Sequence, residues 1–206
     1  TGNFGRGINF LNTGNQHTDN LSVYIGALAG LVQSAENARV QISNLQVKFT
    51  IQVNDAEKNH TYYVGGAVGE VNGLITGQRI FDGDTKVYSV IHSNSTNDNS
   101  SIGGVIGLLS GKAPLHDVVA ISYIYADAGR KIGGVIGRHT SEGEVNNISS
   151  TPMIYAINKS QNIGGVSGSV LNETAYKNIK VKFVDHGADN SVFNSSLTGY
   201  TNIGGI

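Results

Sequence analysis

Several short runs of the chain alternate apolar and polar residues with a period of two. The clearest is 45–53, Leu-Gln-Val-Lys-Phe-Thr-Ile-Gln-Val, and 179–184 repeats the pattern with Lys180 and Lys182 between apolar residues. Successive side chains of a strand point to opposite faces, so this period predicts strands with one buried face. Further β-like runs lie at 87–91, 118–125 and 153–157. Glycine and β-branched residues occupy most windows that a helix would need, so the pattern predicts an all-β chain.

A glycine-rich motif recurs six times along the chain. Its fullest forms are Ser-Ile-Gly-Gly-Val-Ile-Gly at 101–107 and Lys-Ile-Gly-Gly-Val-Ile-Gly at 131–137. The apolar residues that open the copies lie 30 to 40 residues apart and are Ile25, Val64, Ile102, Ile132, Ile163 and Ile203. Repeats of this length are typical of stacked architectures. The spacing therefore predicts a β-solenoid, a parallel β-helix-like fold of about five to six coils.

Each repeat contains the parts of one coil. The glycine motif is followed by turn-forming residues, by an alternating strand and by a connector rich in Asn, Asp and Ser. We expect residues 24–206 to form the solenoid and residues 1–23 to form a cap or a degenerate first coil. Because the last motif stops at 204–206, we also expect the sequence to be part of a longer chain.

The glycines themselves call for a physical reason, since glycine weakens a strand unless another segment approaches closely. We expect them to form a column without side chains at one corner of every coil, where a side chain would collide with the next coil. Gly104→Val should then destabilise the fold strongly. Ser95→Val, in a polar connector, should be tolerated.

Composition excludes several classes of partner. The formal net charge is −1, only 14% of residues are charged and no basic stripe stands out, so nucleic-acid binding is not expected. The absence of cysteine excludes a disulfide framework and thiolate ligands. No apolar run is long enough to span a bilayer, so we expect no membrane insertion of this segment.

No set of residues has the spacing of a catalytic or metal site. The densest ligand-like group is Asp185, His186 and Asp189, which is best interpreted as a solvated loop. Calcium would suit the oxygens of 82–84 (Asp-Gly-Asp) and 97–99 (Asn-Asp-Asn), but neither continues into a calcium-binding loop and turn chemistry is favoured. A pectate-lyase-like enzyme would need clustered carboxylates on one face, and the 15 acidic residues are spread thinly. We therefore expect no catalytic, cofactor-binding or metal-binding residues.

Contact with a partner is the remaining kind of function. The tyrosines at 62, 63, 123, 125 and 155 are candidates for a sugar-binding platform, although stacking between neighbouring coils is the simpler explanation. The connectors Asp185–Asn202 and Ser93–Ser101 are the loops best placed to touch a partner.

The motifs Gly-Gly-Ala-Val-Gly, Gly-Gly-Val-Ile-Gly and Gly-Gly-Val-Ser-Gly, each followed by a turn and a β-run, resemble the GLUG repeat. The runs at 115–126 and 145–156 are similar to the second segment of that repeat, and the resemblance covers most of the chain from Tyr24. Two copies depart from it, since Gly-Ala-Leu-Ala-Gly lacks the doubled glycine and Ser167 takes an apolar position.

The resemblance implies a non-catalytic solenoid of a secreted or cell-surface microbial protein. Two hypotheses follow. In the first, the chain is the stalk or binding surface of an adhesin, and its partner is a glycan or protein on a host or neighbouring cell. In the second, it is an accessory region of a large secreted peptidase similar to the IgA-specific peptidases, where it positions substrate for a catalytic domain elsewhere.

Overall fold

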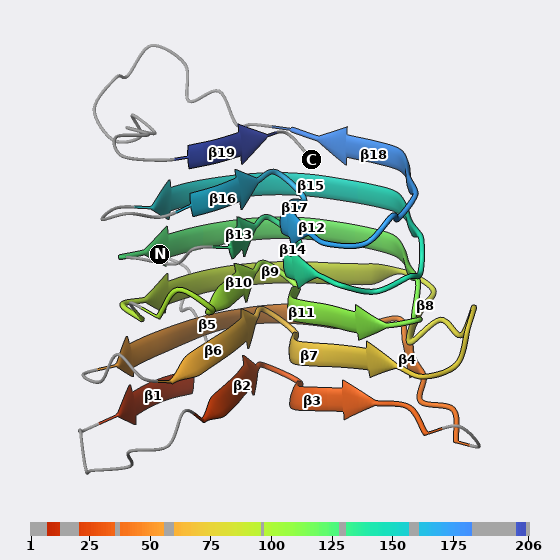
Figure 1. Cartoon of the computed structure of the whole chain (residues 1–206), viewed down its shortest axis with the longest axis horizontal. Coiled ribbons are helices and arrows are strands. Elements are labelled where there is room, and N and C mark those ends of the chain that lie inside the picture. The colour runs from red at the N-terminus through yellow and green to blue at the C-terminus, as the bar shows by residue number, and fades with distance from the viewer. Residues whose placement is uncertain are drawn as a thin grey trace.

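In the computed structural model, the described part of the chain is built only from β-strands (Figure 1). The described residues are 8–12, 21–35, 38–55, 60–95, 97–127, 131–156, 161–182 and 201–204. The prediction of an all-β fold is confirmed. Across these ranges no helix is long and apolar enough to cross a membrane.

Most strands belong to three parallel sheets, which we name A, B and C. Sheet A holds β1 (Ile8–Asn12), β5 (Gln46–Asp55), β9 (Thr85–Ser93), β12 (Leu115–Ala126), β15 (Val145–Ala156) and β18 (Tyr176–Val181). Sheet B holds β2 (Ser22–Gly26), β6 (Thr61–Gly65), β10 (Ser101–Gly103), β13 (Lys131–Gly133), β16 (Gln161–Gly164) and β19 (Thr201–Gly204). Sheet C holds β3 (Ala29–Gln33), β7 (Val68–Gly73), β11 (Ile106–Gly111), β14 (Ile136–His139) and β17 (Ser167–Val170), and a small pair is formed by β4 (Ile42–Ser43) and β8 (Phe81–Asp82).

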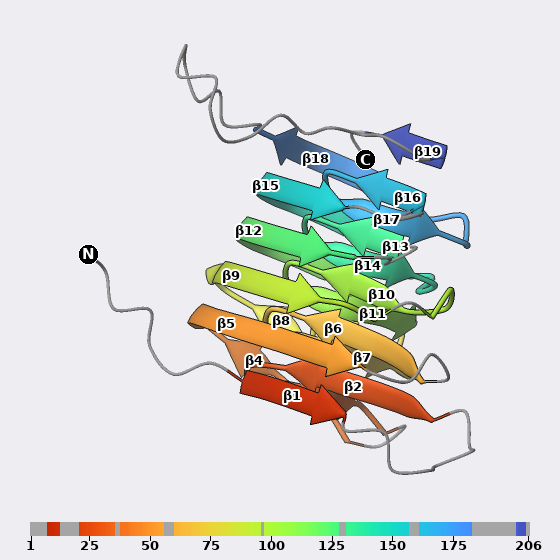
Figure 2. The ribbon, with the colours of Figure 1, turned by 90° about the vertical axis from the view of Figure 1, so that its left-hand side faces the viewer.

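Each coil passes once through sheets B, C and A, and the coils lie on one another as layers (Figure 2). The apolar residues that open the six glycine motifs pair in register from Ile25 in β2 to Ile203 in β19. The predicted β-solenoid is therefore confirmed. The strand β1 pairs in parallel with β5 at the end of sheet A. The division of the chain at residue 23 stays a prediction.

The interior contains two apolar clusters. One lies between sheets A and C and includes Ile106 and Val118, and the other lies between sheets A and B and includes Ile102 and Ile124. The side chains of these four residues are at most 2% exposed. Because every inward side chain packs against its counterparts in the neighbouring coils, the stability of one coil depends on the coils beside it.

The glycine corner joins sheet B to sheet C and presses against the middle of sheet A. A Cβ added to Gly104 would meet the carbonyl oxygen of Gly134 in the next coil and would lie 2.6 Å from the Cβ of Ser122 in sheet A. A Cβ on Gly107 would lie 2.6 Å from the backbone nitrogen of Val64 in the preceding coil. The predicted column of side-chain-free positions is confirmed for Gly66, Gly104 and Gly134, and its cause is contact with main chain of the neighbouring coil and with sheet A.

Buried serines in sheet A complete this corner. The Ser89 hydroxyl donates a hydrogen bond to the Gly104 carbonyl oxygen at 2.8 Å, and Ser122 does the same to Gly134 at 3.0 Å. In the next coil Ser150 donates to Gly165 at 2.6 Å. These bonds satisfy carbonyl groups that the turn leaves without a strand partner, which would be costly in an apolar interior.

The serines at 93, 95, 100 and 101 of the Ser93–Ser101 connector are buried, so the premise on which Ser95→Val was expected to be tolerated is wrong. The side chain of Ser95 is 2% exposed, and its hydroxyl lies 3.1 Å from that of Ser100. The Ser100 hydroxyl in turn accepts a hydrogen bond from the backbone of Tyr62 at 3.0 Å. A valine at 95 would leave part of this buried network without a partner, so the substitution should destabilise the fold.

Candidate functional site

Five large apolar side chains with more than a third of their surface exposed gather on the outer face of sheet A. In β12, Val119, Tyr123 and Tyr125 point outward with 39–42% exposure, while every second residue from Ala120 to Ile124 points into the core. We define the aromatic face as the outward residues Tyr88, Val90, His92, Val119, Ile121, Tyr123, Tyr125, Met153 and Tyr155. A strand that is apolar on both faces is typical of a strand covered on both sides, so this face is the first candidate for contact with a partner.

Stacking between coils uses the ring faces of several of these residues. The rings of Tyr125 and Tyr155 are stacked with centroids 5.1 Å apart, and His92 lies 5.8 Å from Tyr125 on its other side. On sheet B, Tyr63 stacks with Tyr24 at 5.2 Å. Stacking between coils, the simpler of the two explanations, is therefore confirmed for these pairs.

The interpretation of the five tyrosines as one sugar-binding platform is wrong. Tyr62 is fully buried in the core, and Tyr63 lies on sheet B rather than sheet A. Of the five tyrosines, only Tyr123, Tyr125 and Tyr155 lie on the aromatic face. His92 and Tyr155 flank the ring of Tyr125 on its two sides, and Tyr125 covers one face of the Tyr155 ring.

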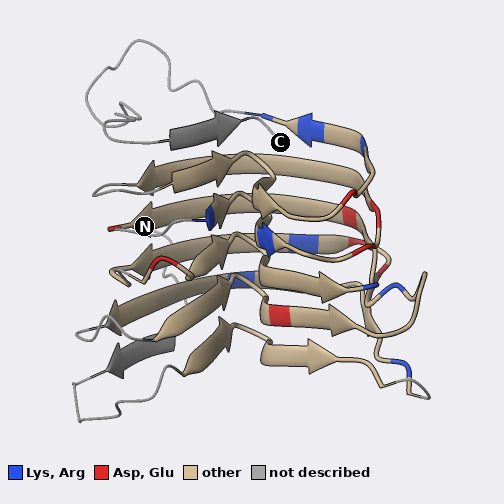
Figure 3. Cartoon of the chain, viewed as in Figure 1, with Lys and Arg blue, Asp and Glu red and all other residues tan. Residues whose placement is uncertain are grey.

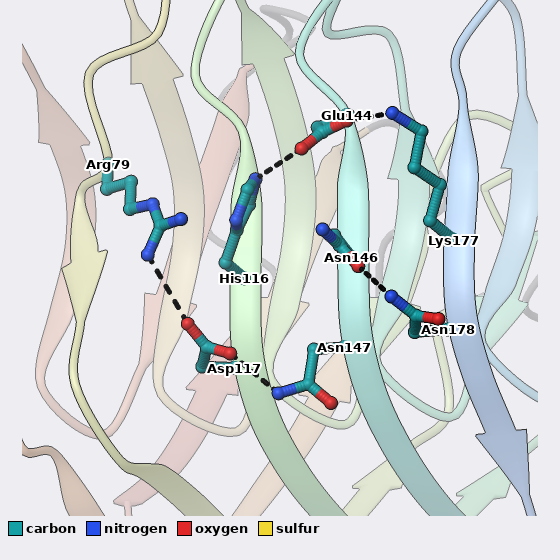
Figure 4. Close-up of polar contacts among 8 residues, drawn as sticks. All are labelled: Arg79, His116, Asp117, Glu144, Asn146, Asn147, Lys177 and Asn178. Atoms are coloured by element: carbon teal, nitrogen blue, oxygen red, sulfur yellow. Dashed lines mark hydrogen bonds and ion pairs between the residues drawn. The ribbon is translucent and has the colours of Figure 1, made fainter.

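A polar ladder lines the corner where sheet C leads into sheet A (Figure 4). Asp117 contacts Arg79 of the coil before at 3.4 Å and accepts a hydrogen bond from the Asn147 amide of the coil after at 2.7 Å. Glu144 lies 2.8 Å from the Lys177 ammonium and 3.3 Å from the ring of His116. Desolvation by burial and the nearby Arg79 guanidinium lower the pKa of His116, so its ring is neutral at pH 7.

The Asp and Asn residues of the ladder lie where the backbone adopts a left-handed conformation, near the start of each long strand of sheet A. Asp117, Asn147 and Asn178 have φ of 57°, 54° and 52°, a conformation that Asn and Asp tolerate better than other non-glycine residues. In β12 this extra residue shifts the alternation, so that Leu115 and Val118 both point into the core. Exposed ion pairs of this kind contribute little to stability. We therefore infer that the main role of the Asn and Asp residues of the ladder is to accept the left-handed conformation near the start of each long strand.

Substitutions at Asn147 test this role. We expect Asn147→Ala to lower the free energy of unfolding by about 1–2 kcal/mol, because alanine is strained at this φ and cannot donate to Asp117. Asn147→Gly removes the hydrogen bond but not the conformation, and it should have the smaller effect. Urea unfolding measures both variants, and an equal or larger loss for the glycine variant would contradict the argument.

A chain of three polar side chains, the buried His139 and Ser167 joined by the half-buried Tyr176, was not foreseen from the sequence. The ring of His139 lies 2.7 Å from the Tyr176 hydroxyl, which lies 2.7 Å from the Ser167 hydroxyl. His139 is fully buried, and its Nε2 has no hydrogen-bond partner. Burial lowers the pKa of His139 from 6.5 to about 4 and raises that of Tyr176 to about 12, so both side chains are neutral at pH 7.

The loops considered for metal binding either make other contacts or lie outside the residues that the structure describes. The backbone of Asn99 donates to the Asn97 side chain at 2.8 Å, as in a turn, and Asp82 accepts a hydrogen bond from Gln41 at 2.7 Å. Gly83 has φ of +70°. The described ranges contain no group of three or more His, Cys, Asp or Glu able to hold a metal ion. Asp185, His186, Asp189 and most of the connector that contains them lie outside the described residues.

Comparison with known proteins relates the chain to streptococcal proteases. It is 24% identical over 188 residues to an immunoglobulin A1 protease of Streptococcus pneumoniae serotype 4, and 27% identical over 198 residues to one of Streptococcus sanguinis. These matches cover 88% and 89% of this chain. It is also 30% identical over 125 residues, or 60% of its length, to the zinc metalloprotease ZmpC of S. pneumoniae serotype 4.

The chain spans only a small part of these relatives. It covers 9% of the length of each immunoglobulin A1 protease and 6% of ZmpC. No family model matches the chain, and no solved structure matches it. The similarity is therefore to one segment of much larger streptococcal proteins.

Proposed function

We propose that this chain is a non-catalytic β-solenoid segment of a large secreted or cell-surface bacterial peptidase, and that it positions a protein substrate for a catalytic domain elsewhere in the chain. The observation that carries the proposal is the match to two immunoglobulin A1 proteases along nearly nine-tenths of this chain but 9% of theirs. A segment of that size can support a catalytic domain without sharing its chemistry. The sequence contains no His-Glu-x-x-His zinc motif, which agrees with this role.

The fold supports a role in positioning. Coils that pair in register along three sheets form a stiff unit whose faces keep fixed distances from one another. The recurrence of the glycine motif at the same corner supports the further proposal that the coils are GLUG repeats. The relatives are named as proteases of immunoglobulin A1, so this is the substrate that we propose to test first.

The stalk or binding surface of an adhesin is the second candidate function. The exposed aromatic face favours it, because a large exposed apolar patch on a stable domain marks a contact site. Its partner would be a glycan or protein on the surface of a host or neighbouring cell. In the peptidase hypothesis the same face contacts the substrate protein.

Deletion of the solenoid from the full-length protein separates the two functions. We expect the variant to cleave a short peptide at the wild-type rate, because the catalytic domain is intact, and to cleave immunoglobulin A1 with kcat/KM reduced about tenfold or more. Equal loss on both substrates would contradict a positioning role, and no loss on either would make the segment a passive spacer. A full-length protein that binds cells but cleaves neither substrate would favour the adhesin.

A further inference from the structure

Three rows of inward side chains cross the coils of sheets C and A and change from apolar to polar at one end. Their earlier members are apolar and in register: Val68, Ile106 and Ile136 in the first row, Val71 and Leu109 in the second, and Leu115 and Val145 in the third. The next positions in these rows are Ser167, His139 and Tyr176. The apolar members all belong to the cluster between sheets A and C, so polar groups close one end of that cluster.

These three polar side chains, which we name the latch, connect two edge strands to the coil before them. In the described part of the chain, β17 and β18 are the last strands of sheets C and A and pair on one side only. Ser167 lies in β17 and Tyr176 in β18, whereas His139 lies in β14. The Tyr176 hydroxyl lies 2.7 Å from the His139 ring and 2.7 Å from the Ser167 hydroxyl. A short polar chain therefore holds the segment 167–182, which we name the flap.

The rest of the flap is weakly packed. Every side chain of β18 is partly or largely exposed, and Val170 and Leu171 at the end of β17 are 40% and 58% exposed. The strand that precedes the flap, β16, differs because it pairs with both β13 and β19. Edge segments with few buried apolar contacts open at a lower free energy than the core of the same domain. The flap is therefore suited to open while the other coils stay folded.

We propose that the flap opens as a unit in mildly acidic solution, and that the latch is the acid-sensitive contact that holds it closed at neutral pH. Opening uncovers the pairing edges of β14 and β15, together with the inward side chains Ile136 and Val145, which are fully buried in the closed form. The device belongs to the fold itself and goes beyond the proposed function, on which it does not rest.

His139 is the group that senses acid. Its ring is fully buried, and its Nε2 has no hydrogen-bond partner. Protonation makes both ring nitrogens donors, so the chain through Tyr176 to Ser167 can reverse its direction, but Nε2 stays unpaired and the charge stays in apolar surroundings. Burial lowers the pKa of His139 to about 4, and an open flap returns it toward 6.5. Between these values the open form binds the proton and the closed form does not, so opening becomes more favourable as pH falls.

The neighbours of His139 on the facing elements carry no charge. In β11 and β17 the positions in register with it are Leu109 and Val170. In β18 the facing titratable group is Tyr176, whose pKa burial raises to about 12, so its hydroxyl is neutral. Burial is the cause of the lowered pKa of His139, without a contribution from a charged group. Protonation of the ring is therefore opposed by its surroundings and not by a nearby cation.

The charged groups closest in sequence or on the flap have other partners. Arg138 interacts with Tyr63 of sheet B. Figure 3 shows charged side chains gathered at the corner where sheet C leads into sheet A, and there Glu144 lies 2.8 Å from Lys177 of the flap and 3.3 Å from His116. The hydrogen bond from Lys177 lowers the pKa of Glu144, so this carboxylate keeps its charge in mild acid. The contact between Glu144 and Lys177 therefore does not open the flap in this range.

Native-state amide hydrogen exchange, followed by NMR, measures the opening. The amides of Leu171 and Lys182 donate to carbonyl groups of β14 and β15 and report on the flap, whereas the amide of Ile106 donates to a carbonyl group of the next coil and reports on the body. We expect the flap amides to be about tenfold or more less protected than Ile106 at both pH 7.5 and pH 5. After correction for intrinsic exchange, the opening constant of the flap should rise about 25-fold from pH 7.5 to pH 5.

Three variants separate the sensor from the rest of the latch. In His139→Leu the opening constant of the flap should change less than about threefold between the two pH values. Tyr176→Phe removes the hydroxyl but keeps the sensor, so opening should be about fivefold more frequent at pH 7.5 and should still increase in acid. His116→Gln is the matched control, because His116 also has a lowered pKa but lies outside the latch, and it should keep most of the wild-type rise.

Three results would overturn the inference. Equal protection of the flap and body amides would mean that the flap opens only when the whole solenoid unfolds. A wild-type opening constant that does not change with pH would remove the acid response. A His139→Leu variant that keeps the wild-type rise would assign that response to another group.

Discussion

Gly104→Ala is expected to lower the free energy of unfolding by about 3 kcal/mol or more, a large fraction of the roughly 5–15 kcal/mol that stabilises a typical domain. The added Cβ meets the carbonyl oxygen of Gly134 and the Cβ of Ser122. Main-chain atoms cannot move aside as a flexible side chain can. Relief would require the corner to move away from sheet A, and this would also break the hydrogen bond from Ser89 to the Gly104 carbonyl, which is 2.8 Å long.

The matched control is Gly77→Ala. An alanine Cβ at Gly77 would have no atom within 4 Å, so only the strain of φ +73° opposes it. We expect a loss of about 1–2 kcal/mol. Urea unfolding followed by far-UV circular dichroism compares the two variants. If Gly104→Ala were no more destabilising than Gly77→Ala, contact at the corner would not be the reason for the repeated glycines.

One natural exception to the glycine column lies in the first complete coil. Ala27 takes the place that Gly66, Gly104 and Gly134 take in the following coils. There the next residue, Leu28, is 49% exposed, whereas its counterparts Ala67 and Val105 are fully buried. The corner of this coil therefore differs from the others, in agreement with its place at one end of sheets B and C.

The fold was predictable from the sequence because a repeated motif is a strong signal. The spacing from Ile25 to Ile203 aligned the coils, and those residues do pair in register. The order of the sheets was not predictable. The long β12 faces both other sheets, and no local pattern shows that the glycine corner touches its middle.

The buried polar groups of the interior could be predicted only in part from the sequence. Ser122 stands in the inward phase of β12, between Ala120 and Ile124, so alternation alone marks it as a buried serine. Its partner, the carbonyl oxygen of Gly134, belongs to a residue type without a side-chain pattern. For the same reason Ser95 was expected to be exposed, because a connector rich in Ser and Asn does not reveal which of its serines pack inward.

The candidate surface was partly predictable. The run Val-Val-Ala-Ile-Ser-Tyr-Ile-Tyr at 118–125 is apolar in both phases, which indicates a strand covered on its two faces. The sequence could not separate Tyr62 from Tyr123, since both stand in β-like runs. Their opposite environments follow from the coil path, which places Tyr62 inward from sheet B and Tyr123 outward from sheet A.

Acid should destabilise the solenoid through His139. In the folded chain burial holds the pKa of this side chain at about 4, against 6.5 in an exposed chain. Between these values the unfolded state binds the proton and the folded state does not, so the free energy of unfolding falls as pH falls from about 6.5 to about 4. A shift of about 2.5 pKa units corresponds to a loss of about 3 kcal/mol.

His139→Leu separates this effect from the titration of other groups. The positions in register with His139 in the neighbouring strands of sheet C are Leu109 and Val170, so leucine suits the site, and the Tyr176 hydroxyl keeps its contact with Ser167 at 2.7 Å. Urea unfolding at pH 7.5, 6, 5 and 4 should show a much smaller loss of stability for the variant. The lowered pKa of His116 acts in the same direction and leaves a residual dependence in both proteins. If the two pH profiles run parallel, another group must be responsible for acid sensitivity, and the neutral buried ring of His139 is not what limits stability.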